Sequence, residues 1–425
     1  MLDINLLRDN PDVVRDALKR RCATDSLATL DDVLGLDTSW RAATHDIELL
    51  KASRNALSDE VKNRKKSGQP ADDLIAKSRQ IGDEIKDLEN KVAAAQAGRD
   101  DLLLRIPNLP LAEVPAGGEG ENIVVRTWGT PRPPEGVRPH WEIAEALGVL
   151  DLARGAKIAG SGFIVFRGMG ARLVRALMNW MLTLHTTEHG YEEVWVPFVA
   201  NRPSMTGTTQ LPKFEDDMYA IPDDGLFLIP TAEVPVTNLH RDEILDGARL
   251  PIALTAYTPC FRREAGSYGK DTRGLLRVHQ FDKVEMVRFC APEDSPAQHE
   301  LLTRHAETVL EQLGLPYRRV LLAAGDTGFG SAKTYDLEVW APGVGKWLEV
   351  SSCSTFTDFQ ARRANIRFRP DGGKPRFVHT LNGSGLAFPR TIAAIFEHYQ
   401  QPDGSVIVPE VLRPFLGGAA RVGPA

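Results

Sequence analysis

Cysteine is scarce in this sequence of 425 residues, and its spacing carries no metal or disulfide signature. The four cysteines are Cys22, Cys260, Cys290 and Cys353, and no two of them form a CxxC pair. Scattered cysteines of this kind argue against a disulfide framework and against a cysteine-rich zinc site. We therefore expect no structural zinc, and the cysteine usage fits a reducing cytoplasm.

Long apolar runs are absent as well. No stretch approaches the roughly 20 apolar residues of a membrane-spanning helix, and the opening residues, MLDINLLRDNPDVV, lack the charged-then-apolar order of a signal peptide. Hydrophobic residues make up 42% of the sequence and charged residues 25%, as in ordinary globular proteins. The net charge of −6 gives no global sign of nucleic-acid binding, so any RNA partner would have to contact local basic patches.

The common phosphate-binding loops are also missing. The sequence contains no GxxxxGK[ST] motif, and no GxGxxG motif lies between an expected strand and an expected helix. If the protein uses a nucleotide, arginine side chains must therefore hold its phosphates.

Residues 1–106 are predicted to be helical almost throughout. Asn10 is a plausible helix cap before Pro11, and two later stretches repeat mostly apolar side chains at steps of three and four. The first stretch contains Trp40, Ala43, Ile47, Leu50, Arg54, Leu57 and Val61; the second contains Leu74, Ser78, Ile81, Ile85, Leu88, Val92, Ala95, Arg99 and Leu102. The helix-breaking segment KKSGQPADD separates them. This pattern predicts an antiparallel coiled-coil hairpin over about residues 37–105, with helices roughly 45 Å long.

The pattern of this hairpin alone leaves its role open. A dimerisation or spacer coil fits the heptads as well as a binding arm does. The cluster Arg64, Lys65 and Lys66 at the expected tip favours contact with a polyanion, although a solvated helix end would show the same charges.

After a linker rich in proline and glycine that begins at Ile106, the pattern changes to short β-rich runs. These runs are GFIVFRG, EEVWVPFVA, LFLIPTAEVP, VHQFDKVEMVRF, TYDLEVWAP and KWLEVSSCS, with helical stretches between some of them. Several strands follow one another without a helical crossover, which favours an antiparallel or mixed sheet. We therefore predict an α+β chain with a helical domain at residues 1–106 and a sheet domain flanked by helices at residues 107–425.

The stretch TPCFRREAGSYGKDTRGLLRVHQFDKVE, residues 258–285, concentrates arginines and carboxylates in one expected hairpin. Arginine offers a fixed fork of donors that suits phosphate and carboxylate oxygens. If Arg262 and Glu264 lie on a strand, their side chains share one face, and Phe281 offers an aromatic face to a base. A ladder of ion pairs beside a core phenylalanine is the alternative for this stretch taken alone.

Three further stretches reduce the weight of that alternative. PTAEVP places Glu233 at an expected strand end, where it could receive an ammonium group. WLEVSSCS combines Glu349 with serines, which are hard oxygen ligands suited to Mg²⁺. HTLNGSGLAFPRTIAAIFEHYQ, residues 379–400, is expected to run from a strand through a glycine turn into an amphipathic helix that carries Arg390 in its first turn. Together these segments predict a cationic, metal-assisted nucleotide pocket with spare carboxylates for a small amine.

These motifs, taken together, resemble those of the bacterial-type seryl-tRNA synthetases, a family of class II aminoacyl-tRNA synthetases. HGYEEVWVPFVA resembles the family's first class motif, residues 258–285 the second, and residues 379–400 the third. The resemblance covers essentially the whole chain. It implies a tRNA-binding helical arm, a class II catalytic domain, ATP and L-serine as substrates, Mg²⁺, tRNA(Ser) and tRNA(Sec) as partners, and a cytoplasmic homodimer.

The resemblance also assigns roles to individual residues. Arg262 would hold the serine carboxylate and the α-phosphate, Glu264 the adenine amino group, and Phe281 would stack on adenine, while the loop Ala265–Leu276 would cover ATP. The other residues implied to bind ATP are Arg263, Arg277, Val278, Glu349, Val350, Ser351, Ser352 and Arg390. Those implied to bind serine, besides Arg262, are Thr231, Ala232, Glu233, Glu285, Thr380, Asn382 and Ser384. Glu349 and Ser352 would hold the metal, and Arg64, Lys65 and Lys66 would contact tRNA.

Three departures from the family and two rival functions remain. Arg263 stands where many relatives have a small polar residue, and Ser267–Tyr268 and the pair Phe388–Pro389 stand where they usually have smaller residues. The pair Phe388–Pro389 leaves room for a second, inhibitor-tolerant copy of the enzyme. A synthetase-like ligase that loads serine onto a carrier protein would keep the pocket but not the arm. A non-catalytic RNA-binding or coiled-coil scaffold would lose the arginines and the metal carboxylate.

Overall fold

A computed structural model describes residues 1–265 and 273–423 of the chain. The chain divides into two compact units, one made of residues 1–19 and 23–107, the other of residues 20–22 and 108–425. None of the helices within the described ranges is long and apolar enough to cross a membrane.

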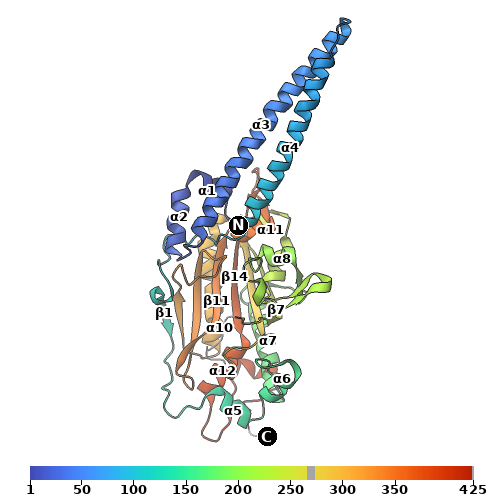
Figure 1. Cartoon of the computed structure of the whole chain (residues 1–425). Coiled ribbons are helices and arrows are strands. Elements are labelled where there is room, and N and C mark those ends of the chain that lie inside the picture. Colours follow the sequence, from blue (N-terminus) through green and yellow to red (C-terminus); the bar gives the residue numbers. More distant parts are fainter. Residues whose placement is uncertain (266–272, 424–425) are drawn as a thin grey trace. The chain divides into compact units, whose positions relative to one another are not determined.

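The first unit is helical, as the sequence predicted. Its helices are α1 (Ile4–Asp9), α2 (Pro11–Arg20), α3 (Ser26–Lys66) and α4 (Asp72–Leu103). Helices α3 and α4 run antiparallel as a long hairpin (Figure 1). Ile47, Ile81 and Ile85 are buried in the seam between them, and Leu50, Leu57, Leu88 and Val92 pack against that core. The predicted heptad positions therefore meet across the hairpin.

Helix α3 begins earlier than the predicted hairpin, at Ser26 rather than near residue 37. Leu30 and Val33 are fully buried, so the apolar face of α3 continues toward its N-terminus below the coiled coil. Asp37 is also buried, and its carboxylate forms ion pairs with Arg8 and Arg41 at 3.0 Å and with Arg99 at 3.2 Å. A buried charge is tolerated when it is paired in this way, and this one joins α1, α3 and α4.

The second unit is built on an eight-stranded sheet (Figure 1). The strands lie in the order β1 (Ile123–Trp128), β9 (Tyr317–Leu321), β10 (Lys333–Ala341), β11 (Lys346–Thr357), β14 (His379–Ala387), β8 (Gln280–Cys290), β7 (Ile252–Phe261) and β2 (Glu192–Glu193). Neighbours pair antiparallel except β2 with β7, which are parallel. The prediction of an antiparallel or mixed sheet is confirmed.

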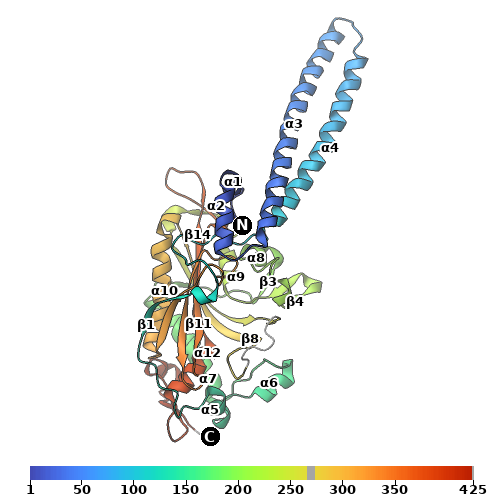
Figure 2. The ribbon, with the colours of Figure 1, turned by 60° about the vertical axis from the view of Figure 1, so that its left-hand side comes forward.

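Helices and smaller sheets surround this central sheet (Figure 2). The helices are α5 (His140–Ala146), α6 (Leu152–Ala159), α7 (Met169–Thr187), α8 (Arg202–Gly207), α9 (Glu233–Thr237), α10 (Ser295–Gln312), α11 (Phe359–Ala364) and α12 (Phe388–Tyr399). The remaining strands are β3 (Val199–Asn201), β4 (Ala220–Ile221), β5 (Leu226–Leu228), β6 (Ile244–Asp246), β12 (Arg367–Arg369), β13 (Arg376–Phe377), β15 (Val406–Ile407) and β16 (Arg421–Val422). Strands β3, β5 and β4 form one small sheet, β13, β12 and β6 a second, and β15 and β16 a third.

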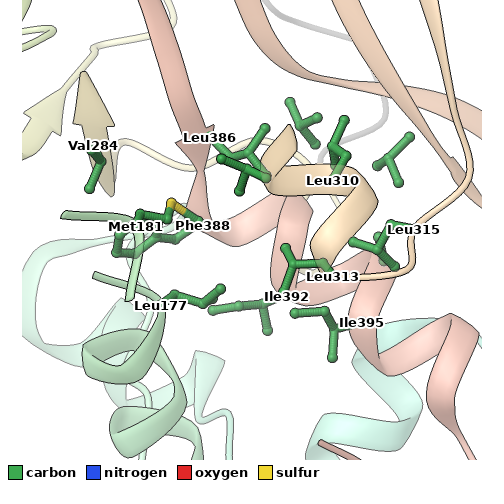
Figure 3. Close-up of a cluster of buried hydrophobic side chains, with 14 of the residues drawn as sticks. Leu177, Met181, Val284, Leu310, Leu313, Leu315, Leu386, Phe388, Ile392 and Ile395 are labelled. Carbon is green, nitrogen blue, oxygen red and sulfur yellow. The ribbon is translucent and has the colours of Figure 1, made fainter. Parts of the chain in front are cut away.

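Strand β8 shows how the sheet separates core from site. Its side chains alternate between the two faces of the sheet. Val284 and Met286 enter a core that also contains side chains of α7, α10 and α12 (Figure 3), whereas Phe281 and Glu285 line a cavity on the opposite face. The same alternation that builds the core therefore aims the functional side chains of β8 into the cavity.

Local structure differs from the sequence prediction at three places. The run GFIVFRG forms only an isolated bridge between Leu150 and Phe166. Glu233 opens the short helix α9 instead of ending a strand. The expected glycine turn before α12 is absent, because Gly383 and Gly385 lie within β14. A Cβ atom at Gly383 would lie 2.4 Å from the Leu302 side chain, so the glycine allows α10 to pack closely on the strand.

Candidate active site

Three arginines from separate segments line one cavity of about 740 Å³ in the second unit. Arg262 follows β7, Arg277 precedes β8, and Arg390 lies in the first turn of α12. Arg262 and Glu264 were expected on a strand, but β7 ends at Phe261. Glu264 adopts a left-handed backbone with φ of 53°. Both side chains nevertheless reach the cavity.

Most of the predicted site residues line this cavity. They are Thr231, Glu233, Arg262, Glu264, Arg277, Val278, Phe281, Glu285, Glu349, Val350, Ser352, Asn382, Ser384 and Arg390. Of the loop Ala265–Leu276 that was expected to cover ATP, residues 266–272 lie outside the described residues. Leu275 and Leu276, at its end, belong to the cavity wall.

Four predicted residues do not line the cavity. Ala232 is fully buried in a hydrophobic cluster beside the sheet. Arg263 is exposed, and its backbone N–H donates to the carbonyl of Asp217. Ser351 is buried and donates to the carbonyl of Ser384 at 2.7 Å, so it braces β11 against β14.

The fourth, Thr380, lies one layer behind the cavity. Its hydroxyl donates to Gln360 Oε1 at 2.7 Å, and Gln360 Nε2 donates to Glu233 Oε1 at 2.6 Å. Thr380 therefore reaches the cavity through Gln360 and Glu233.

One end of the cavity holds buried carboxylates. Glu285 forms an ion pair with Lys283, and the Lys283 ammonium also donates to Thr231 Oγ1 at 3.0 Å. Burial, with a smaller contribution from the charge of Glu285, raises the pKa of Glu233 to about 7. An arriving ammonium ion would favour the charged form of Glu233, so this end can accept an amine together with a hydroxyl.

The other end is arranged for anions and a hard cation. Arg390 donates to the carbonyls of Glu349 at 2.7 Å and Leu276 at 3.1 Å, and its guanidinium lies 3.6 Å from the Glu349 carboxylate. Arg277 forms an ion pair with Glu264. The guanidinium of Arg262 lies over the Phe281 ring, 5.2 Å from its centre.

A β-bulge brings Glu349 and Ser352 to the same face of β11. Residues three apart on a regular strand point to opposite faces. The pairing of β10 with β11 shifts between Leu337 and Glu338, so Val350 is an extra residue and the alternation reverses. Both oxygen donors then face the cavity.

These donors fit a magnesium ion. A further carboxylate, Asp336, pairs with Ser352 across the strands, and its Oδ1 is buried with no hydrogen-bond partner among the described residues. Burial and the charge of Glu349 raise the pKa of Asp336 well above its usual value. The described residues include no group of three or more histidine, cysteine, aspartate or glutamate side chains arranged as a complete metal site. Carboxylate and hydroxyl oxygens beside a phosphate site are what Mg²⁺ uses, with substrate oxygens and waters completing its shell.

Sequence reasoning missed Lys283, Gln360 and Asp336. Lys283 stands two residues before Glu285, so strand alternation alone could have placed it on the site face. Gln360 reaches Glu233 from α11, 127 residues farther along the chain, and no local pattern marks it. Asp336 could be found only from its pairing with Ser352.

The arm-tip residues differ from one another. Arg64 forms ion pairs with Glu60 and Asp73, both at 3.1 Å, so it ties α3 to the start of α4. Lys65 and Lys66 are exposed. The two lysines are therefore more available to an outside anion than Arg64.

Comparisons with known proteins agree on one family. Residues 1–110 match the model of the seryl-tRNA synthetase N-terminal domain. Residues 213–399 match the class II tRNA synthetase core domain of the G, H, P, S and T group. The serine–tRNA ligase of Gemmatimonas aurantiaca is 63% identical over 422 residues, covering 99% of both chains. That of Pelotomaculum thermopropionicum is 54% identical over the full length of both.

Solved structures give the same result. A seryl-tRNA synthetase from Pyrococcus horikoshii complexed with ATP superposes with a TM-score of 0.96 at 41% identity, covering all of both chains. A cytoplasmic serine–tRNA ligase from Naegleria fowleri in complex with AMP gives 0.90 at 32% identity, covering 100% of this chain and 99% of the other.

Proposed function

The chain belongs to the seryl-tRNA synthetase family of class II aminoacyl-tRNA synthetases, and we propose that it is a serine–tRNA ligase. It activates L-serine with ATP to give seryl-adenylate and pyrophosphate, and then transfers the seryl group to tRNA(Ser). The convergence of Arg262, Arg277 and Arg390 on one cavity with carboxylates at its far end carries this proposal. The ATP bound to the Pyrococcus horikoshii relative supports it.

In the first step, the serine carboxylate attacks the α-phosphorus of ATP in line, and the bond to the bridging oxygen of pyrophosphate breaks. The carboxylate is already ionised at neutral pH, so the site needs no general base for this step. Arg262 aligns the carboxylate with the α-phosphate, while Arg277 and Arg390 hold the leaving pyrophosphate. Catalysis comes from alignment and from neutralising charge that develops on the phosphorus oxygens.

Serine is selected by the buried carboxylate end. Glu233 receives the ammonium group, and Thr231 and Glu285 pair with the hydroxyl. Alanine would leave these buried partners unsatisfied, at about 1–3 kcal/mol for each group. The extra methyl group of threonine would be excluded by its size.

Mg²⁺ would bind at Glu349 and Ser352, with Asp336 behind them. When bound, it supplies positive charge to the phosphate oxygens. Arg390 donates to the carbonyl of Glu349 and would thereby hold β11 in position beside the phosphates.

In the second step, a terminal ribose hydroxyl of the tRNA attacks the carbonyl carbon of the adenylate, and AMP leaves. The helical domain predicted at residues 1–106 would act as the tRNA-binding domain, and residues 107–425 would form the catalytic domain. A helical hairpin suits recognition of an RNA helix by shape and backbone contacts. Lys65 and Lys66 would contact the RNA, Arg64 would support the turn, and tRNA(Sec) would be a second substrate.

The protein would act as a homodimer in the cytoplasm. The first class motif contains β2, an edge strand of the main sheet, and the Trp195 side chain of this motif is 72% exposed. A large exposed aromatic group beside a sheet edge favours association with another copy. The cytoplasmic location is supported by the free state of all four cysteines.

The rival functions are not favoured. A carrier-loading ligase has no use for the helical hairpin. Residues 1–110, which include it, match the seryl-tRNA synthetase N-terminal domain, and the relatives align with this chain over 99% or more of its length. Of the pair Phe388–Pro389, Phe388 is 1% exposed and lies in the core shown in Figure 3, whereas Pro389 lines the cavity. Inhibition by a seryl-adenylate analogue tests whether Pro389 makes the site inhibitor-tolerant.

The test is aminoacylation of bulk tRNA with each of the twenty amino acids, together with amino-acid-dependent ATP–pyrophosphate exchange. Serine alone should support both reactions. Exchange with serine but no tRNA charging would favour the carrier-loading ligase, and absence of both reactions would contradict the proposed function.

A further inference from the structure

The cavity wall between Gly274 and Val278 is held from behind by His140 and Glu397, neither of which lines the cavity. Leu275, Leu276 and Arg277 line the cavity, and Arg277 is one of the three converging arginines. Small shifts of this segment would move Arg277 relative to a bound nucleotide. What fixes its backbone therefore bears on ATP binding.

A buried chain of hydrogen bonds reaches this segment from helix α12. The backbone N–H of Leu275 donates to His140 Nε2 at 3.0 Å. On the other side of the ring, His140 Nδ1 lies 2.7 Å from Glu397 Oε1. The side chains of His140 and Glu397 are both 0% exposed, so water does not compete for these bonds.

The chain of contacts assigns the tautomer of His140. A backbone N–H can only donate, so Nε2 must be the acceptor and carries no proton. The ring proton is then on Nδ1, where it is donated to Glu397. Glu397 is held in turn by the backbone N–H groups of His140 at 3.0 Å, Gly343 at 2.8 Å and Val344 at 3.3 Å.

Gly274, the residue before Leu275, packs closely against the same His140 ring. Gly274 has a φ of +64°, and a Cβ atom there would lie 2.5 Å from His140 Nε2. The guanidinium of Arg273 lies over the Trp141 ring, 5.1 Å from its centre. The segment thus packs against residues 140–141 as well as hydrogen-bonding to them, and glycine is required at the point of closest approach.

Helix α12 is hydrogen-bonded to residues 274–278 at two adjacent positions, Leu275 through His140 and Leu276 directly. Arg390 and Glu397 are seven residues apart and share a face of the helix. Arg390 Nε donates to the carbonyl of Leu276 at 3.1 Å, and Glu397 acts on the N–H of Leu275 through His140. One helix therefore carries a phosphate-site arginine and also orients the wall that carries Arg277.

We propose that His140, held in a single tautomer by Glu397, is a positioning residue that sets the backbone of residues 274–278 and thereby places Arg277 for ATP. That the ligand is ATP rests on the proposed function, whereas the contacts of His140 come from the structure. His140 itself does not line the cavity.

Two substitutions of His140 test the roles of its two ring nitrogens separately. His140→Gln can place an acceptor near the position of Nε2 but loses the donor to Glu397, whereas His140→Asn keeps a donor near Nδ1 but loses the acceptor for Leu275. We expect H140N to raise the ATP KM in exchange about 10-fold or more, within the range of losses seen for orienting partners, and H140Q to raise it much less. The serine KM should hardly change in either variant.

Two further variants control for folding and for generic loss of a histidine. Gly274→Ala leaves the His140–Glu397 pair intact but pushes the segment away, so it should reproduce the effect of H140N on the ATP KM. His240→Asn removes another histidine paired with a glutamate, Glu243 at 2.8 Å, away from the cavity, and should leave the ATP KM unchanged. Thermal melting of each variant is measured alongside.

Affinity for a non-hydrolysable ATP analogue, measured by calorimetry in the same variants, distinguishes this inference from the proposed function. If the parent protein binds the analogue and H140N and G274A weaken binding more than H140Q does, His140 has the positioning role even if serine proves not to be the substrate. If H140Q is as impaired as H140N, or if ATP affinity falls only in proportion to melting temperature, His140 is merely part of the core and the inference is wrong.

Discussion

The two units of this protein bury charge very differently. In the described part of the helical unit, Asp37 is the buried charged side chain, and three arginines surround it. In the sheet unit, Glu233, Lys283 and Glu285 are all buried within one cavity wall, and Glu233 has a raised pKa.

This contrast indicates where chemistry can occur. A paired, buried charge such as Asp37 holds helices together, and its arginines leave it little to offer a ligand. A group of incompletely compensated charges in a cavity has a free energy that a substrate can lower by supplying the missing partner. The helical unit is therefore suited to contact with the proposed tRNA partner, and the sheet unit is suited to catalysis. Each of the following predictions tests that division.

The largest effect is expected from Arg262→Ala. Loss of the guanidinium that aligns the two reacting groups should lower serine-dependent ATP–pyrophosphate exchange by about 10³-fold or more, by analogy with other transition-state donors. The melting temperature should be nearly unchanged. Arg369→Ala is the matched control, because Arg369 is exposed on β12 and does not line the cavity. Retention of normal exchange by R262A would remove the central assumption of the mechanism.

Shortening the arm should separate the two units functionally. Replacing residues 45–93 by a short glycine-containing turn keeps Asp37, Arg41 and Arg99, and so keeps the ion pairs at the base of α3. We expect tRNA charging to fall about 100-fold or more, because the lost contacts are with RNA, while exchange stays near the parent rate. Equal loss of both activities would show that the arm is needed for adenylate formation too.

The raised pKa of Glu233 leads us to expect that the serine KM depends on pH. Because burial raises the pKa of Glu233 to about 7, its carboxylate is mostly neutral at pH 6 and mostly ionised at pH 8. The serine KM should therefore rise about 10-fold as the pH falls from 8 to 6, following the ionised fraction. Glu233→Gln should raise the KM and flatten its pH dependence, whereas an undiminished slope in E233Q would assign the titration to another group.

The smallest effect is expected at the tip of the arm. Lys65→Ala combined with Lys66→Ala should raise the tRNA KM a few-fold and reduce its dependence on salt, since each phosphate contact contributes about one unit to the salt slope. The exchange rate should not change. Arg64→Ala offers a comparison, since Arg64 pairs with Asp73 and Glu60, and it should instead loosen the turn.

The sequence predicted the helical unit better than the site. Ile47 belongs to one run of three-and-four spacing, and Ile81 and Ile85 belong to a second run. Each run marks the apolar face of its helix, because residues on one face of a helix recur at short steps in sequence, and the two faces meet in the seam. Helix α3 itself begins at Ser26, before the segment predicted to form the hairpin, and its first turns bury Leu30 and Val33.

In the sheet unit, residue types were easier to predict than their placement. Arginines, carboxylates and the Phe281 ring could be recognised as candidates from their chemistry. The position of Thr380 behind Gln360 and Glu233 could not be predicted, since it depends on α11 packing beside β14, and no local repeat records that packing.

The sequence by itself determined the helical hairpin, the succession of strands, and the set of charged groups available for binding a nucleotide and an amino acid. These follow from periodicities of two and 3.6 residues and from side-chain chemistry, both of which are local. Only the tertiary structure decided that a bulge at Val350 turns Glu349 and Ser352 to one face, and that Glu397 reaches Leu275 through His140. Bulges and buried hydrogen bonds depend on partners far along the chain, so they exist only once the sheet and its helices have come together.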